Sequence, residues 1–138
     1  MQVKEAMHKG VQWVEPSTPV KEIAKLMRDH DIGAIPIGEN DRLIGMVTDR
    51  DLVCRGLAQG TDANKLTARD VMTKGIVYCR ETTDMAEAAR LMQTNKIRRI
   101  PVVNEAKRMV GMLALGDITH ASPRTLAGDV MSAVSAHH

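Results

Sequence analysis

Hydrophobic and polar positions alternate along the chain in a way that predicts the same elements twice. Short apolar runs at residues 11–14 and 76–79 predict strands, and an i, i+3, i+4, i+7 spacing after each run predicts an amphipathic helix. Two β-branched runs follow in each half, at residues 34–37 and 43–47 and at residues 99–103 and 109–113. Helices that begin near Asp49 and near Gly116 complete the order, so each half is expected to fold as β-α-β-β-α.

The two halves are also related residue by residue, which indicates a tandem duplication of about 60 residues. Met7-His8-Lys9-Gly10 corresponds to Met72-Thr73-Lys74-Gly75 at a spacing of 65 positions, and Pro36 corresponds to Pro101 at the same spacing. Asp51 and Asp117 match at a spacing of 66 after one inserted residue. Because neither half alone would bury much core, we expect an α/β (α+β) fold in which two repeats pack about a pseudo-twofold axis.

These patterns divide the chain into three parts. Residues 1–60 form the first repeat with an N-terminal helix and the start of a linker, and residues 61–121 form the second repeat. Residues 122–138 are expected to form a C-terminal helix and tail that dock on the module, because residues 126–131 echo residues 68–72.

The junction between the predicted strand at residues 43–47 and the helix after it is the main candidate site. Thr48 stands where its side-chain oxygen can cap the helix, and Asp51 offers a carboxylate one turn later. The unpaired N–H groups and the positive end of the helix dipole favour an anionic or polyhydroxyl ligand there. A purely structural helix cap with an acid in the first turn is the alternative for the same residues.

Composition narrows the class of protein. The 138 residues are 43% hydrophobic and 26% charged with a net charge of +2, which is typical of a globular domain and too small for electrostatic binding of nucleic acid or membrane. No run is long enough to span a membrane, and the first residues lack a signal-peptide core. Cys54 and Cys79 stand far apart, as expected of free thiols in a reducing compartment, so the chain is expected to be cytoplasmic.

The doubled unit resembles a CBS-domain pair, also called a Bateman module. The resemblance rests on a hydrophobic-Pro-hydrophobic strand in each half and on Gly-x-x-Thr-x-x-Asp at residues 45–51, and it spans residues 3–119. Residues 29–34 and 41–43 are similar to stand-alone bacterial pairs of the hypoxic-response-protein type. The resemblance implies a non-catalytic regulatory module that needs no cofactor and senses AMP, ADP, ATP or another adenosine derivative in clefts between the repeats.

The resemblance also implies roles for individual residues. In such modules the threonine position, here Thr48, contacts ribose or phosphate, and Asp51 holds ribose hydroxyls. The basic pair Arg98-Arg99 before Pro101 would reach the phosphates, since a guanidinium binds phosphate oxygens in a bidentate manner. Adjacent strand residues point to opposite faces, so one of the two arginines is expected to enter the site.

Apolar strand residues would hold the purine, because the chain has one Trp, one Tyr and no Phe for stacking. Met46 and Val77 are the candidates for this contact. In the second repeat Asp117 keeps the carboxylate, but Ala114 replaces the threonine, and Gly33-Ala34 replaces the basic pair. We therefore expect one site competent for nucleotides and a second that is weak, empty or limited to an uncharged adenosine moiety.

Other functions stay open at this point. The runner-up is a ligand-free dimerisation or adaptor module whose Met-rich helices bind an unidentified protein partner, and a homodimer is expected in either case. A basic patch for nucleic acid is a weaker alternative in view of the small net charge. The spacing of Cys and His residues predicts no metal site, although ligands from distant residues or subunits could assemble one for zinc. No catalytic motif stands out, so an enzyme is not expected.

Overall fold

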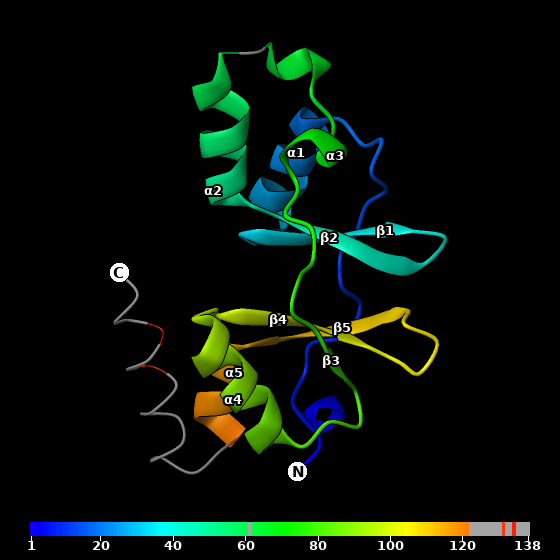
Figure 1. Cartoon of the computed structure of the whole chain (residues 1–138), viewed down its shortest axis with the longest axis vertical. Helices are drawn as coiled ribbons and strands as arrows, with labels where there is room; N and C mark the ends of the chain where they lie inside the picture. The colour runs from blue at the N-terminus through cyan, green and yellow to red at the C-terminus, as the bar shows by residue number, and fades with distance from the viewer. Residues whose placement is uncertain (61, 122–130, 132–133, 135–138) are drawn as a thin grey trace. The chain divides into compact units, whose positions relative to one another are not determined.

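The computed structural model describes residues 1–60, 62–121, 131 and 134 of the chain, and it forms two compact units. The first-repeat unit is Gln12–Ile76, and the second-repeat unit joins Met1–Val11 to the chain from Val77 onward (Figure 1). The chain passes from one unit to the other at residues 11/12 and 76/77, because the segment before each repeat packs on the other repeat. The repeat boundaries at 60/61 and 121/122 stay a prediction.

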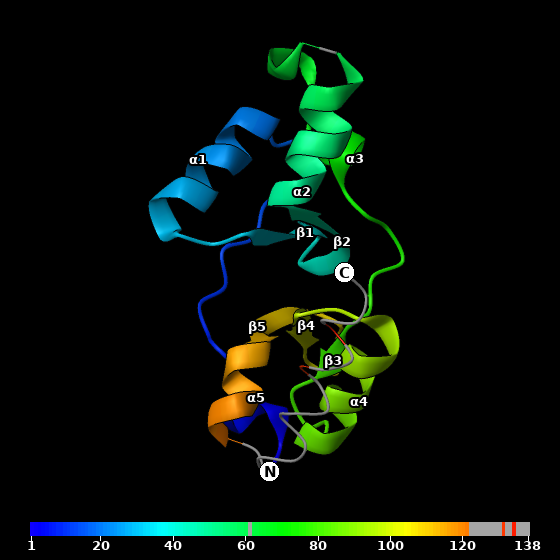
Figure 2. The ribbon, with the colours of Figure 1, turned by 90° about the vertical axis from the view of Figure 1, so that its left-hand side faces the viewer.

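The first-repeat unit is built on the antiparallel hairpin of β1 (Ala34–Glu39) and β2 (Arg42–Thr48). Helices α1 (Val20–His30), α2 (Asp49–Asp51) and α3 (Ala68–Val71) cover one face of this hairpin (Figures 1 and 2). A π-helical turn, Leu52–Gly56, continues α2, and 3-10 turns follow at Leu57–Gln59 and Ala63–Lys65. Ile23, Ile35 and Val47 lie fully buried in the core between the helices and the hairpin.

The second-repeat unit repeats this plan on a sheet in the order β3-β4-β5. The short strand β3 (Cys79–Arg80) runs parallel to β4 (Arg99–Val103), which pairs antiparallel with β5 (Met109–Ala114). Helices α4 (Met85–Asn95) and α5 (Leu115–Ala121) lie on one face of the sheet, as both views show (Figures 1 and 2). Met92, Ile100 and Leu113 are fully buried in its core, which confirms the predicted mixed α/β repeat.

Each unit is completed by the segment that precedes the other repeat. His8 exchanges two backbone hydrogen bonds with Met112 of β5, at 2.9 and 3.0 Å, and Thr73 does the same with Met46 of β2, at 2.8 and 3.1 Å. Glycines in the strands permit this close approach: a Cβ at Gly45 or at Gly111 would lie within 3.1 Å of the carbonyl oxygen of Thr73 or His8, respectively. Pairing of these segments therefore depends on two strand positions that have no side chain.

In each half, the first of the predicted strands is shorter than expected. At residues 11–14 only Val14 pairs, as an isolated parallel bridge to Ile37. The pairing does not extend because Pro36 lacks the N–H that would reach the carbonyl oxygen of Gln12, and Pro16 lacks the N–H on the other side. The strand predicted at residues 76–79 begins at Cys79, since residues 74–78 connect Thr73 in one unit to Cys79 in the other.

The segment predicted as a C-terminal helix, residues 122–138, lies outside the described residues except for Met131 and Val134. Val134 is buried with the core of the second-repeat unit. In the described part of the chain, no helix combines the length and the apolar character needed to cross a membrane.

Candidate functional site

The junction of β2 and α2 carries the hydroxyl and the carboxylate that the sequence predicted. Thr48 has extended backbone angles and caps α2, and its Oγ1 accepts a hydrogen bond from the N–H of Asp51 at 3.1 Å. In return Oδ2 of Asp51 accepts from the N–H of Thr48 at 2.9 Å, which completes a capping box. The two side chains are thereby held together at the start of a helix, where backbone N–H groups point outward.

One oxygen of the Asp51 carboxylate remains available in this arrangement. The nearest cation to Oδ1 is Nε of Arg55, at 3.8 Å, which is beyond hydrogen-bond distance. Arg55 instead donates from its guanidinium to the carbonyl oxygen of Met72 at 3.0 Å. The Asp51 side chain is 14% exposed, so the carboxylate is held in place and is partly open to solvent.

The corresponding junction in the second repeat differs. Oδ2 of Asp117 accepts a hydrogen bond from the N–H of Ala114 at 2.7 Å, as Asp51 does with Thr48, but Ala114 offers no hydroxyl in return. Oδ1 of Asp117 lies 2.9 Å from Nε2 of His8. Both oxygens of this carboxylate are therefore engaged within the second-repeat unit.

The other predicted site residues divide between the units. Met46 is buried on β2 beside Thr48, whereas the remaining four, Val77, Arg98, Arg99 and Pro101, belong to the second-repeat unit. Arg99 pairs with Ala114 across β4 and β5, and the carbonyl oxygen of Arg98 accepts from the first N–H of α5, so the basic pair lies at the same end of the sheet as Asp117. Both arginines are exposed, and within the described residues neither guanidinium has a hydrogen-bond or ion-pair partner.

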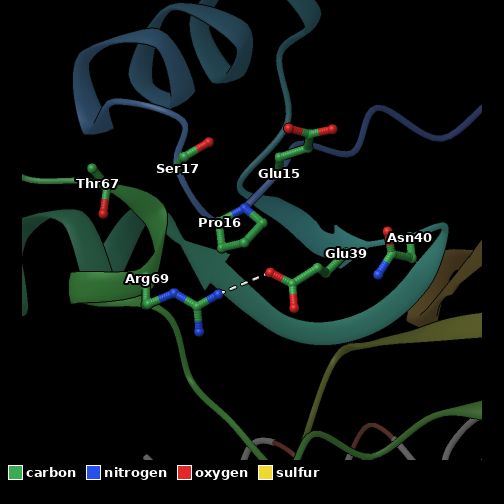
Figure 3. A pocket seen from close by; sticks show the side chains of 7 residues that line it. All are labelled: Glu15, Pro16, Ser17, Glu39, Asn40, Thr67 and Arg69. Atoms are coloured by element: carbon green, nitrogen blue, oxygen red, sulfur yellow. Dashed lines mark hydrogen bonds and ion pairs between the residues drawn. The ribbon is translucent and has the colours of Figure 1, made fainter.

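A separate cavity of about 480 Å³ lies at the opposite end of the first-repeat hairpin (Figure 3). Most of the residues that line it are of polar or charged type: Glu15, Pro16, Ser17, Glu39, Asn40, Thr67 and Arg69. Figure 3 shows Arg69 turned toward Glu39, and these groups form an ion pair at 3.0 Å. Because β2 extends roughly 20 Å from its start near Asn40 to Thr48, this cavity is distinct from the capping-box site.

Metal binding has no evident place in the described residues, where no three His, Cys, Asp or Glu side chains converge. Cys79 is buried and Cys54 is exposed, and neither forms a disulfide. Burial raises the pKa of the Cys79 thiol to about 11, which leaves it protonated and unreactive near neutral pH.

Two related α/β repeats, each with an aspartate at a strand–helix junction, define a tandem-repeat module. The chain belongs to the CBS domain family, whose model matches residues 3–55 and 68–124. The two matches correspond to the two repeats, so the chain is a CBS-domain pair.

Named relatives agree with this assignment. Hypoxic response protein 1 of Mycobacterium tuberculosis (strain ATCC 25618 / H37Rv) is 40% identical over 121 residues, which cover 87% of this chain and 84% of that protein. CBS domain-containing protein YhcV of Bacillus subtilis (strain 168) is 39% identical over 116 residues, with coverage of 84% and 81%.

Solved structures share the fold. A crystal structure of Hypoxic Response Protein I with two coordinated zinc ions has a TM-score of 0.81 at 39% identity, and the match covers 89% of this chain and 100% of that one. A structure of CBSX2 in complex with AMP, a protein of Arabidopsis thaliana, has a TM-score of 0.76 at 28% identity, with coverage of 87% and 94%.

Sequence reasoning missed two residues at these junctions, Arg55 and His8. Arg55 follows Asp51 by four positions on a helical segment, a spacing that places side chains on one face and could have been noticed. His8 is 109 positions before Asp117, and only its equivalence to Thr73 within the duplication pointed to a shared position.

Proposed function

We propose that this CBS-domain pair is a non-catalytic regulatory module that binds an adenosine-containing nucleotide of the AMP, ADP or ATP type through Thr48 and Asp51. The observation that carries the proposal is the available Oδ1 of Asp51, held by the capping box beside the Thr48 hydroxyl. A carboxylate oxygen accepts hydrogen bonds from both hydroxyls of a ribose, and the threonine O–H is free to donate to a phosphate or ribose oxygen.

Arg98 and Arg99, whose guanidinium groups have no partner within the part of the chain that the structure describes, are the proposed partners of the ligand's phosphates. An arginine without an internal partner retains its full set of donors for phosphate oxygens, and this pairing is charge-assisted and strong. Met46, Val77 and Pro101 are proposed to supply apolar contacts to the purine. The CBSX2 complex with AMP supports this class of ligand, since that protein shares the fold.

Thermal unfolding with AMP, ADP, ATP, S-adenosylmethionine and NADH tests the proposal. A ligand present at about one hundred times its dissociation constant stabilises the folded state by about 2.7 kcal/mol, enough to raise the melting temperature by several degrees. We expect a rise with at least one of these ligands, and we expect Asp51→Ala to abolish that rise.

Asp70 provides a matched control for this variant. Thr67 and Asp70 occupy the same capping positions at the start of α3, where the N–H of Thr67 donates to Oδ2 of Asp70 at 2.8 Å and the Thr67 hydroxyl donates to the same oxygen at 3.1 Å. Asp51→Ala and Asp70→Ala therefore remove equivalent helix caps, but only Asp51→Ala removes the proposed ligand contact. Equal ligand responses in the two variants would contradict the site, and no response of the unmodified protein to any of the five would contradict the function.

An adaptor or dimerisation role is the second candidate, and an apolar groove on the first-repeat unit favours it. The groove, of about 350 Å³, is lined mainly by nonpolar atoms of Val20, Lys21, Ala24, Leu52, Gly56, Leu57, Ala63 and Asn64. Beside it Val53 and Leu57 are 55% and 69% exposed, so further apolar surface is available for a second copy of the chain. A homodimer by light scattering that dissociates in Leu57→Glu would support this role, and a monomer at micromolar concentration would oppose it.

A further inference from the structure

In the second repeat His8 contacts the carboxylate of Asp117, whereas in the first repeat one oxygen of the Asp51 carboxylate has no hydrogen-bond partner among the described residues. Oδ1 of Asp117 lies 2.9 Å from Nε2 of His8, and Oδ2 accepts from the N–H of Ala114, so both oxygens have a partner. Among the described residues, the same oxygen of Asp51 has only Nε of Arg55 as a neighbouring cation, at 3.8 Å. The two carboxylates are equally enclosed, at 13% and 14% exposure, so this difference arises from the partner and not from burial.

The backbone of His8 is fixed, although its side chain is 73% exposed. Two hydrogen bonds to Met112 hold it against β5, and Gly111 leaves room for its carbonyl oxygen. Thr73 has the same pair of bonds to Met46 beside Gly45 in the first-repeat unit. Thr73 has no hydrogen bond to Asp51 among those of the described residues, so the imidazole is the feature by which the two positions differ.

We infer that His8 is an intramolecular occupant of the second repeat's ligand site and determines how tightly that site binds. The inference rests on the proposed function, in which the aspartates hold ribose hydroxyls. A ribose that approaches Asp117 must displace an imidazole N–H donor from Oδ1, whereas a ribose at Asp51 meets an oxygen without a hydrogen-bond partner in the described part of the chain. His8 thus lowers the affinity of the second repeat for nucleosides.

The exposure of the contact between His8 and Asp117 indicates how much His8 changes the affinity of the second site. A side-chain contact as exposed as that between His8 and Asp117 contributes little, and its loss corresponds to about a two- to fivefold change in an equilibrium constant. The contact is therefore displaceable, and the second site is weakened by His8 without being closed.

The experiment uses adenosine, which carries no phosphate, because Ala114 in the second repeat lacks the hydroxyl that Thr48 would offer to a phosphate. Calorimetric titrations in an Asp51→Ala background report on the second site alone. We expect His8→Ala to tighten adenosine binding there about two- to fivefold and His8→Gln, which keeps a hydrogen-bond donor, to have a smaller effect. Thr73→Ala is the matched control and should leave the affinity unchanged, and Asp117→Asn should abolish the gain.

The outcomes separate this inference from the proposed function. If AMP binds the unmodified protein through Asp51 but His8→Ala fails to tighten adenosine binding at the second site, the inference about His8 is wrong and the proposed function stands. If His8→Ala weakens adenosine binding, His8 is a ligand contact and the inference is also wrong. If neither AMP nor adenosine binds the unmodified protein or any variant, both the proposed function and the inference about His8 are wrong.

Discussion

Gly111→Ala tests how closely the N-terminal segment must approach β5. A Cβ at this position would lie 2.8 Å from the carbonyl oxygen of His8 and 2.5 Å from Sδ of Met7, whereas ordinary contacts begin at 3.4 Å. The Met7 side chain can turn away, but the carbonyl oxygen belongs to the backbone and must move by 0.6 Å, the difference between 3.4 and 2.8 Å. That movement strains the two hydrogen bonds between His8 and Met112.

Overpacking of this kind costs about 1–3 kcal/mol. For a chain of this length each kcal/mol corresponds to roughly 3–5 °C in melting temperature, so differential scanning calorimetry should record a clear decrease. A displaced His8 should also release Asp117, so in the Asp51→Ala background Gly111→Ala should tighten adenosine binding as His8→Ala does.

Gly116→Ala is the control for this prediction. Beyond its own helix and chain neighbours, no atom of the described residues lies within 4 Å of a Cβ at Gly116 in α5, so alanine there should be neutral or stabilise by up to about 1 kcal/mol. An unchanged melting temperature in Gly111→Ala would refute the claim that the glycine is required for the close approach of His8.

Three further predictions concern single side chains. Thr48→Ala removes the acceptor for the Asp51 N–H and should cost about 1 kcal/mol in urea unfolding, which Thr48→Ser should restore. Met92→Ala empties a fully buried position and should cost about 2–5 kcal/mol, whereas Leu57→Ala, at an exposed position, should change stability by less than about 0.5 kcal/mol. Burial raises the pKa of Cys79 from 9.0 to about 11, so between these values the folded chain retains a proton that the unfolded chain loses. Stability should therefore fall as pH rises from 9 to 11, and Cys79→Ala should show a smaller fall.

Elements defined by local pattern could be predicted from the sequence. The helical stripes at residues 20–27 and 85–92 became α1 and α4, and the β-branched runs became the paired strands of each unit. The turn between β1 and β2 is tight because Asn40 and Asp41 both adopt positive φ angles, at 55° and 64°, which these two residue types tolerate well. The capping box of Thr48 and Asp51 follows from the same local chemistry.

Features that depend on distant pairing could not be predicted in this way. The segment around His8 pairs with a strand about one hundred residues later, and no periodicity in either stretch indicates that partner. The π-helical turn Leu52–Gly56 after α2 likewise has no simple pattern. The duplication contained the missing information, because the pairing of Thr73 with Met46 implies the pairing of His8 with Met112 at equivalent positions.

The duplication also allows the residues that both repeats share to be compared with those that differ between the two junctions. The strand glycine, the methionine after it and the junction aspartate occur in both repeats, and the backbone bridges that they support are the same. The repeats differ at the junction, where Ala114 replaces Thr48, and in the preceding segment, where His8, which contacts Asp117, corresponds to Thr73. Under the proposed function, both differences weaken ligand binding in the second repeat, since one removes a hydroxyl and the other engages the carboxylate. Together, the proposed function and the inference about His8 predict that the first site binds nucleotide at concentrations that leave the second site empty.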